Sequence, residues 1–444
     1  MTLTILAFGM VIVFMTLIMT RKMAPLTALI LVPIAFGLLG GFAPALGAMM
    51  LAGVVKLAPT GIMLTFAILY FAIMIDAGLF EPVVTLLVRI VDRDPVKVVV
   101  GTAALALIVS LDGDGSTTYM ITAAAMLPLY RRLGIRPLVL ACVTMMAGGV
   151  MNILPWGGPT ARAATALSVD ASDLFVPLIP SMLVAAAWVL YAAYRLGRNE
   201  RSRIASEGIV AFDEETALID PSESSVDTRR PKLLWVNALL TVLLMAALVK
   251  GVMPLPVLFM IGFAIAIMIN YPSVAEQKHL LATHAANVMG VASLIFAAGV
   301  FTGILSGTKM VDAMADSVVH VIPAAMGPYL SIVTGILSIP FTFFISNDAF
   351  YYGILPILAK AGQAYGITAA EMGRASLIGQ PVHLLSPLVP STYLLVGLVG
   401  VDFDAHQRFT LKWALLTALV LLGTGLLTTV IPLVGHLAAT PLPH

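Results

Sequence analysis

Charged residues are scarce in this chain of 444 residues, and their scarcity excludes most classes of soluble protein. Asp, Glu, Lys and Arg make up only 11% of the sequence, whereas they make up about 25% of an ordinary globular domain. Hydrophobic residues make up 60%, which leaves too little polar surface for a water-soluble protein of this length. The composition therefore excludes a soluble enzyme, a nucleic-acid-binding domain and a disordered chain.

The chain also has almost no net charge, only one cysteine and neither of two common catalytic motifs. The 24 basic and 23 acidic residues give a net charge of +1, so no field attracts nucleic acid or another polyanion. The single cysteine, Cys142, cannot form an intramolecular disulfide. Because neither an HExxH motif nor a Walker motif occurs, a zinc protease and an ATP-driven pump have no support.

Hydrophobic runs fill most of the chain. A membrane-spanning helix needs roughly 20 apolar residues. The sequence predicts an all-α polytopic membrane protein with about ten transmembrane helices, at residues 4–20, 24–41, 59–76, 137–168, 174–196, 233–250, 255–271, 285–306, 369–400 and 408–432.

Three other segments divide this pattern. Apolar stretches at 96–129 and 325–359 are broken at their centres by polar residues and glycine, and each is too long for one span. We predict that both are re-entrant hairpins. The polar segment 197–232 carries six basic and eight acidic residues, and it reads as a cytoplasmic linker that is too polar for a folded domain.

The two sides of the linker have the same predicted order: three spans, a hairpin, a broken span and a span. An odd number of crossings inverts the second copy, so we predict two inverted repeats at 1–196 and 233–444. The distribution of basic residues favours chain termini on the outside of an inner (cytoplasmic) membrane. The first hairpin then opens to the cytoplasm and the second to the exterior.

Helical breaks at matching places in inverted halves are typical of transporter binding sites. Such breaks expose N–H groups at helix N-termini, which attract anions. Nearby neutral donors suit a small, multiply charged anion. The candidates are Ser116, Thr117, Thr118, Asn152, Thr160, Ser346, Asn347, Ser386, Ser391 and Thr392, with Gly157 and Gly158 shaping the first break and offering main-chain groups.

Acidic residues at the hairpin tips complicate an anion site. Asp112 and Asp114 lie at the first tip and Asp348 at the second, and carboxylates within a membrane are usually functional. They would repel a bare anion, so either a hard cation accompanies it, held by oxygen ligands, or the carboxylates are protonated. Asp112 and Asp114 are the metal-ligand candidates; the alternative is that Asp114 or Ser116 caps the following helix.

Two further residues at membrane depth have alternative roles. Arg162 can grip a substrate carboxylate with two hydrogen bonds, or it can pair with a buried aspartate. His383 can relay protons, or it can hydrogen-bond a broken helix. Asp348 and His383 are therefore the candidates for proton coupling.

Three sequence motifs resemble a known family. Residues 111–121 (LDGDGSTTYMI), 152–158 (NILPWGG) and 71–80 (FAIMIDAGLF) closely resemble the bacterial divalent metal–citrate:proton symporter family of the ion transporter superfamily. The resemblance implies uptake of citrate complexed with Mg²⁺ or Ca²⁺, coupled to protons, with no other cofactor. The superfamily implies a homodimer in the lipid bilayer. It also implies a scaffold and a mobile transport domain that holds the hairpins and broken helices and moves as an elevator.

Other functions are compatible with some of these features. A carboxylate:proton symporter for gluconate or a dicarboxylate would work without metal. A membrane-embedded enzyme could use Asp112, Asp114 and His383, although duplicated hairpins argue against it, because an enzyme needs only one site orientation. A passive channel would show flux without accumulation. The sequence favours a transporter and no enzymatic activity.

Overall fold

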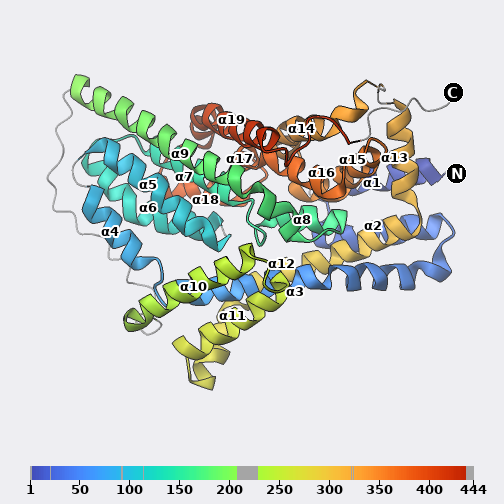
Figure 1. Ribbon diagram of the computed structural model, residues 1–444, viewed down its shortest axis with the longest axis horizontal. Coiled ribbons are helices and arrows are strands. Elements are labelled where there is room, and N and C mark those ends of the chain that lie inside the picture. Colours follow the sequence, from blue (N-terminus) through green and yellow to red (C-terminus); the bar gives the residue numbers. More distant parts are fainter. Residues whose placement is uncertain are drawn as a thin grey trace.

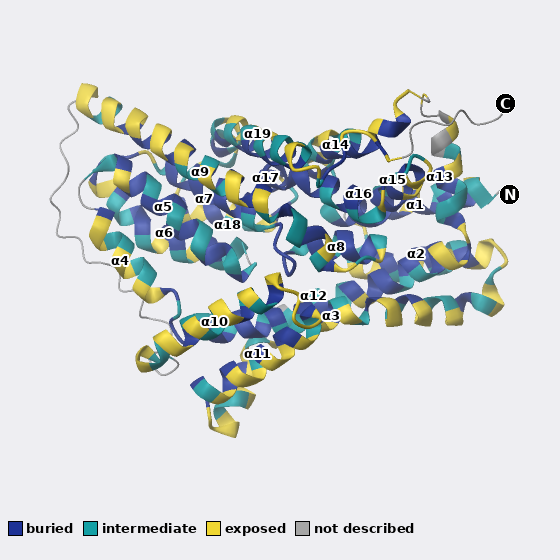
Figure 2. Ribbon diagram, in the orientation of Figure 1, coloured by how far each residue is buried: buried dark blue, intermediate teal, exposed yellow. Residues whose placement is uncertain are grey.

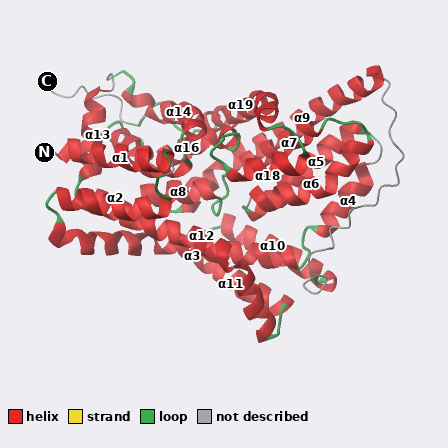
Figure 3. Ribbon diagram, turned by 180° about the vertical axis from the view of Figure 1, so that it is seen from behind, coloured by secondary structure: helices red, strands yellow, loops and turns green. Residues whose placement is uncertain are grey.

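The computed structural model describes residues 3–20, 22–91, 94–113, 115–207, 229–321, 323 and 325–436. Within these ranges the regular elements are all helical, and no strand occurs (Figure 3). Asp114 and the greater part of the predicted linker, 208–228, lie outside the described residues.

The first half of the chain forms helices on both sides of two interruptions. Its helices are α1 (Leu3–Met19), α2 (Pro25–Leu39), α3 (Leu46–Asp76), α4 (Glu81–Val91), α5 (Pro95–Val109), α6 (Gly115–Arg132), α7 (Pro137–Met151), α8 (Gly158–Leu167) and α9 (Ala171–Glu207). Short 3₁₀ turns, η1 (Ala43–Ala45) and η2 (Ser110–Asp112), precede α3 and follow α5.

The second half follows a similar order. Its helices are α10 (Leu234–Val249), α11 (Leu255–Asn270), α12 (Val274–Gly307), α13 (Met310–Val321), α14 (Leu330–Phe344), α15 (Leu355–Gln363), α16 (Ala369–Ser376), α17 (Gln380–His383), α18 (Pro390–Val399) and α19 (Phe403–Leu427). A π-helical turn, η6 (Ala349–Ile354), leads into α15.

Seven helices within the described residues are long and apolar enough to cross a membrane, and several shorter apolar helices accompany them. Three helices extend well beyond their predicted spans: α12 begins at Val274 rather than at residue 285, and α3 and α9 are also longer. α3 begins at Leu46 and runs through Pro59, which membrane helices tolerate when neighbouring groups satisfy the freed backbone. Residues 197–207, predicted as the start of the linker, continue α9, where an ion pair between Arg203 and Glu207 supports the last turns.

The helices form two layers (Figure 1). α3 and α12 lie along each other with α2, α10 and α11 in one layer, while α5–α9 and α14–α19 make up the other. Figure 2 shows exposed residues along the outer faces of α3, α9, α10 and α11. These exposed residues include large apolar ones such as Leu51, Leu183, Trp235 and Met268, as expected for a surface that faces lipid.

Glycine allows the closest approach between α3 and α12. A Cβ atom on Gly53 would lie 2.0 Å from the carbonyl oxygen of Gly299, and one on Gly303 would lie 2.3 Å from the carbonyl oxygen of Met49. Because the obstacles are main-chain atoms, neither clash can be relieved by a side-chain rotation. The two backbones therefore touch only because these positions lack side chains.

We expect Gly53→Ala to destabilise the protein by about 1–3 kcal/mol, because the added methyl group forces the two helices apart. A lower midpoint of thermal unfolding in detergent measures this effect. Gly47→Ala is the matched control on the same helix, since nothing lies within 4 Å of a Cβ atom there. Equal midpoints for the two variants would show that the close approach does not limit stability.

Candidate functional site

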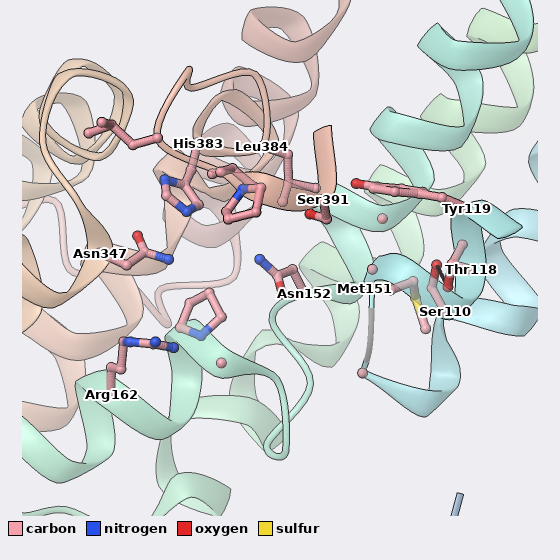
Figure 4. Close-up of a pocket in the computed structure, with 18 of the residues that line it drawn as sticks. Ser110, Thr118, Tyr119, Met151, Asn152, Arg162, Asn347, His383, Leu384 and Ser391 are labelled. Carbon is pink, nitrogen blue, oxygen red and sulfur yellow. Dashed lines mark hydrogen bonds between the residues drawn. The ribbon is translucent and has the colours of Figure 1, made fainter. Parts of the chain in front are cut away.

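A cavity of about 330 Å³ lies where interruptions of the two halves meet (Figure 4). The turn between α5 and α6 and the break between α7 and α8 contribute from the first half. The turn after α14 and the break between α17 and α18 contribute from the second half. The described lining residues with polar side chains are Ser110, Thr118, Tyr119, Asn152, Arg162, Ser346, Asn347, Asp348, His383 and Ser391.

Local sequence explains the first break. α7 ends at Met151, and the chain turns through residues 152–157 before α8 begins with a proline in its first turn. The Thr160 hydroxyl donates a hydrogen bond to the carbonyl of Ile153 (2.8 Å) and holds the turn closed. A Cβ atom on Gly157 would lie 2.3 Å from the carbonyl oxygen of Asn152, so only glycine fits. The N-terminus of α8 therefore opens onto the cavity, which favours a negative ligand.

The first hairpin tip rests on this break. The indole N–H of Trp156 donates to the carbonyl of Leu111 (2.9 Å). Gly113 adopts φ +79°, and a Cβ atom there would lie 2.6 Å from Cδ1 of Trp156. Gly115 and Thr118, in the first turn of α6, also line the cavity. The tip and the break thus form one wall.

The second half builds the opposite wall in a similar way. The Ser386 hydroxyl donates to the carbonyl of Phe343 (2.7 Å), and the Thr392 hydroxyl donates to the carbonyl of Leu384. The His383 Nδ1 atom lies 2.6 Å from the Thr342 carbonyl oxygen. Because a carbonyl only accepts, Nδ1 carries a proton, and Nε2 is the acceptor when the ring is neutral.

Arg162 and Asp348 join the two walls. The Nε atom of Arg162 on α8 lies 2.6 Å from Oδ1 of Asp348, which precedes η6. Both residues line the cavity, and their side chains are 23% and 13% exposed. The pairing alternative for Arg162 is therefore present in the structure. Its place in the lining also allows a substrate carboxylate to take the position of Asp348.

A buried amide network lies behind the cavity, and the sequence analysis missed its central residue. Asn152 donates to Oε1 of Gln380 (3.2 Å), and Nε2 of Gln380 donates to the Tyr351 hydroxyl (2.8 Å). Gln380 is fully buried. The available signal was an amide side chain within the apolar stretch 369–400, which is the reasoning that selected Asn152. Ser110 and Tyr119 were missed as well, although both line the cavity.

The cavity brings together about half of the predicted site residues. Those in its lining are Thr118, Asn152, Gly158, Arg162, Ser346, Asn347, Asp348, His383 and Ser391. Those outside the lining are Asp112, Ser116, Thr117, Gly157, Thr160, Ser386 and Thr392. Among the latter, the hydroxyls of Thr160, Ser386 and Thr392 bind main-chain carbonyls, and they stabilise the breaks rather than face the cavity.

The charges of the described lining nearly cancel. Arg162 and Asp348 oppose each other, and His383 adds a charge only when protonated. Asp112 is 7% exposed and lies outside the lining. In the part of the chain that the structure describes, no cluster of three or more His, Cys, Asp or Glu residues can hold a metal ion.

The fold has a counterpart among solved structures. MtrF of Neisseria gonorrhoeae, whose structure is said to illuminate a class of antimetabolite efflux pumps, matches with a TM-score of 0.61 at 15% identity. The match covers 86% of this chain and 83% of that chain. This likeness shows a shared all-helical, multi-span membrane fold.

Sequence comparisons give closer relatives. A Bacillus subtilis (strain 168) protein named "Citrate transporter" is 59% identical over 429 residues, which cover 97% of this chain and 99% of that protein. A second protein of that strain, named "Mg(2+)/citrate complex secondary transporter", is 51% identical over 427 residues, covering 96% and 98%. Residues 5–379 match the family described as "Citrate transporter". The chain therefore belongs to the citrate transporter family, CitMHS, and is a secondary transporter of the membrane rather than an enzyme.

Proposed function

We propose that this protein imports citrate as a complex with a divalent metal ion, coupled to protons. The observation that carries the proposal is a cavity at the meeting point of the interruptions. Among its described lining residues, the charged side chains are those of Arg162 and Asp348. Fully ionised citrate carries three negative charges, which this lining would leave largely uncompensated. A bound divalent cation leaves the complex with one net negative charge. The positive charge of a single guanidinium can balance it.

The metal ion is cargo in this proposal, and citrate supplies most of its oxygen ligands. Mg²⁺ and Ca²⁺ both prefer oxygen, and a complete site of acidic ligands is missing from the described lining. Asn152 offers an amide oxygen at the cavity. Asp114, which stands between two lining glycines in the sequence, remains a proposed ligand, whereas Asp112 is a weaker candidate because it lies outside the lining.

Asp348 links citrate binding to protons. Its carboxylate occupies the Nε side of Arg162 at 2.6 Å, where a citrate carboxylate would compete for the same donor. A proton on Asp348 removes its charge and weakens the ion pair. Arg162 is then available to citrate, so binding of the proton and binding of the substrate favour each other.

The architecture supports transport by alternating access. We propose two inverted repeats, with the hairpins at 96–129 and 325–359, in a homodimer whose chain termini lie outside the inner membrane. The interruptions that meet at the cavity all belong to the layer of α5–α9 and α14–α19. That layer is the proposed transport domain, and it moves as an elevator against the layer that contains α3 and α12.

Labelled citrate uptake into proteoliposomes with an inward proton gradient tests the proposed function. We expect accumulation above the external concentration when Mg²⁺ or Ca²⁺ is added, and loss of accumulation with a chelator or a protonophore. Protein-free vesicles are the control. Equal uptake with the chelator present would favour the metal-independent carboxylate:proton symporter. Flux without accumulation would indicate a passive channel instead.

A further inference from the structure

The direction of the amide network behind the cavity is set by a main-chain carbonyl. The Tyr351 hydroxyl lies 3.4 Å from the carbonyl oxygen of Ser376, at the end of α16. Because a carbonyl has no hydrogen to give, Tyr351 is the donor. The hydroxyl oxygen of Tyr351 is then the acceptor for its other neighbour, the amide of Gln380.

The hydrogen bond to Tyr351 fixes the orientation of the Gln380 amide, which in turn contacts an asparagine from each half of the chain. Its Nε2 atom donates to Tyr351 at 2.8 Å and points toward Oδ1 of Asn347 at 3.5 Å. Its Oε1 atom therefore faces the first half, where it accepts from Nδ2 of Asn152 at 3.2 Å. If the Gln380 amide were reversed, its oxygen would face Oδ1 of Asn347 and its nitrogen would face Nδ2 of Asn152. Because Gln380 is fully buried, water could not replace the hydrogen bonds lost in that orientation.

The network leaves an amide oxygen of one asparagine and an amide nitrogen of the other for the substrate. Asn152 uses its nitrogen on Gln380, so its Oδ1 atom remains for the cavity. Asn347 uses its oxygen, so its Nδ2 atom remains. Figure 4 shows the two side chains reaching toward each other from opposite walls. The two asparagines thus present an acceptor from the first half and a donor from the second.

We propose that Gln380 is a positioning residue of the citrate site, which holds the Asn347 amide nitrogen toward a citrate carboxylate and the Asn152 amide oxygen toward the metal ion. The inference rests on the proposed function and adds the orientation of the complex within the cavity. Citrate carboxylates face η6, Arg162 and the N-terminus of α8, and the cation faces Asn152 at the C-terminal end of α7, which is the negative end of that helix.

Gln380→Glu tests this inference with little change in size. A carboxylate cannot donate, so Asn347 turns its nitrogen to Glu and its oxygen to the citrate carboxylate. Losing one hydrogen bond to a charged group corresponds to a rise in KM for metal–citrate of about tenfold or more. Vmax stays close to that of the parent. In an Asn347→Ala background, Gln380→Glu gives no further rise, because it acts through Asn347.

Gln407→Glu is the matched control, since Gln407 is half-buried on α19 and donates to the carbonyl of Leu385, which is not a member of the amide network. Suppose that the parent shows metal-dependent citrate uptake in the same vesicles. An unchanged KM for Gln380→Glu, or an equal rise in KM in the Asn347→Ala background, would then overturn this inference but not the proposed function. No metal-dependent uptake by the parent would overturn the proposed function and this inference with it.

A second pair of variants applies if Gln380→Glu does not fold. Asn347→Asp replaces the cavity-facing donor by a charged oxygen opposite a carboxylate, and we expect KM to rise by at least about tenfold. Asn152→Asp keeps an oxygen toward the cation, so its KM rises much less. The reverse ranking of these two variants would show that the amides are oriented the other way.

Discussion

Replacing Arg162 by lysine is expected to raise the KM for metal–citrate by about tenfold to 100-fold, the range for one lost hydrogen bond to a charged group. Lysine keeps the positive charge but lacks the planar fork that holds a carboxylate with two parallel bonds. Initial rates of labelled citrate uptake over a range of metal–citrate concentrations measure the change.

Arg374→Lys is the matched control for this substitution. Arg374 on α16 is also partly buried, but its guanidinium donates to the main-chain carbonyls of Val430 (2.6 Å) and Asp173 (2.9 Å), outside the cavity lining. We expect its KM to match that of the parent. If Arg162→Lys transports as well as the parent, then Arg162 serves the ion pair with Asp348 and does not grip the substrate.

The class of the protein was predictable from the sequence because it depends on bulk properties. Few charges and long apolar runs require a membrane, whichever residues contact one another. The breaks were also predictable, because proline and glycine act locally: Gly157 fits the turn that follows α7, and Pro159 lies in the first turn of α8. The family motifs point to the same segments, and the comparisons confirm the family and the citrate transport that the resemblance implied.

Pairings across the molecule were not predictable. Arg162 and Asp348 are 186 residues apart, and Asn152 and Gln380 are 228 residues apart. The sequence around a polar residue shows that it interrupts an apolar run. It does not show which distant residue will hydrogen-bond or pair with it. Gln380 was therefore missed, and both alternatives for Arg162 stayed open.

Hydroxyl residues show a second limit of the sequence. Thr118 and Thr160 each follow a predicted interruption, yet only Thr118 lines the cavity. The Thr160 hydroxyl binds a carbonyl of its own turn, which short polar side chains commonly do. The choice between substrate and main chain depends on side-chain direction, which the spacing of the sequence does not give.

Replacing Asp348 by asparagine is expected to abolish proton-driven accumulation while citrate exchange across the membrane continues. Asparagine has nearly the shape of a protonated aspartic acid and carries no charge, so Arg162 stays available to citrate whether or not a proton is present. Binding then no longer requires a proton, and a proton gradient no longer drives the cycle. Gradient-driven uptake and citrate–citrate exchange in the same proteoliposomes separate the two activities.

Asp312→Asn provides the control, because Asp312 on α13 also pairs with a base, Lys360 at 3.1 Å, but its side chain is 42% exposed and lies outside the cavity lining. We expect this variant to accumulate citrate as the parent does. If Asp348→Asn also accumulates citrate, another group carries the proton, and His383 is then the remaining candidate in the described lining, since its Nε2 atom is the acceptor of the neutral ring. If exchange is lost together with accumulation, Asp348 is required to keep Arg162 in place, and its role is structural rather than coupling.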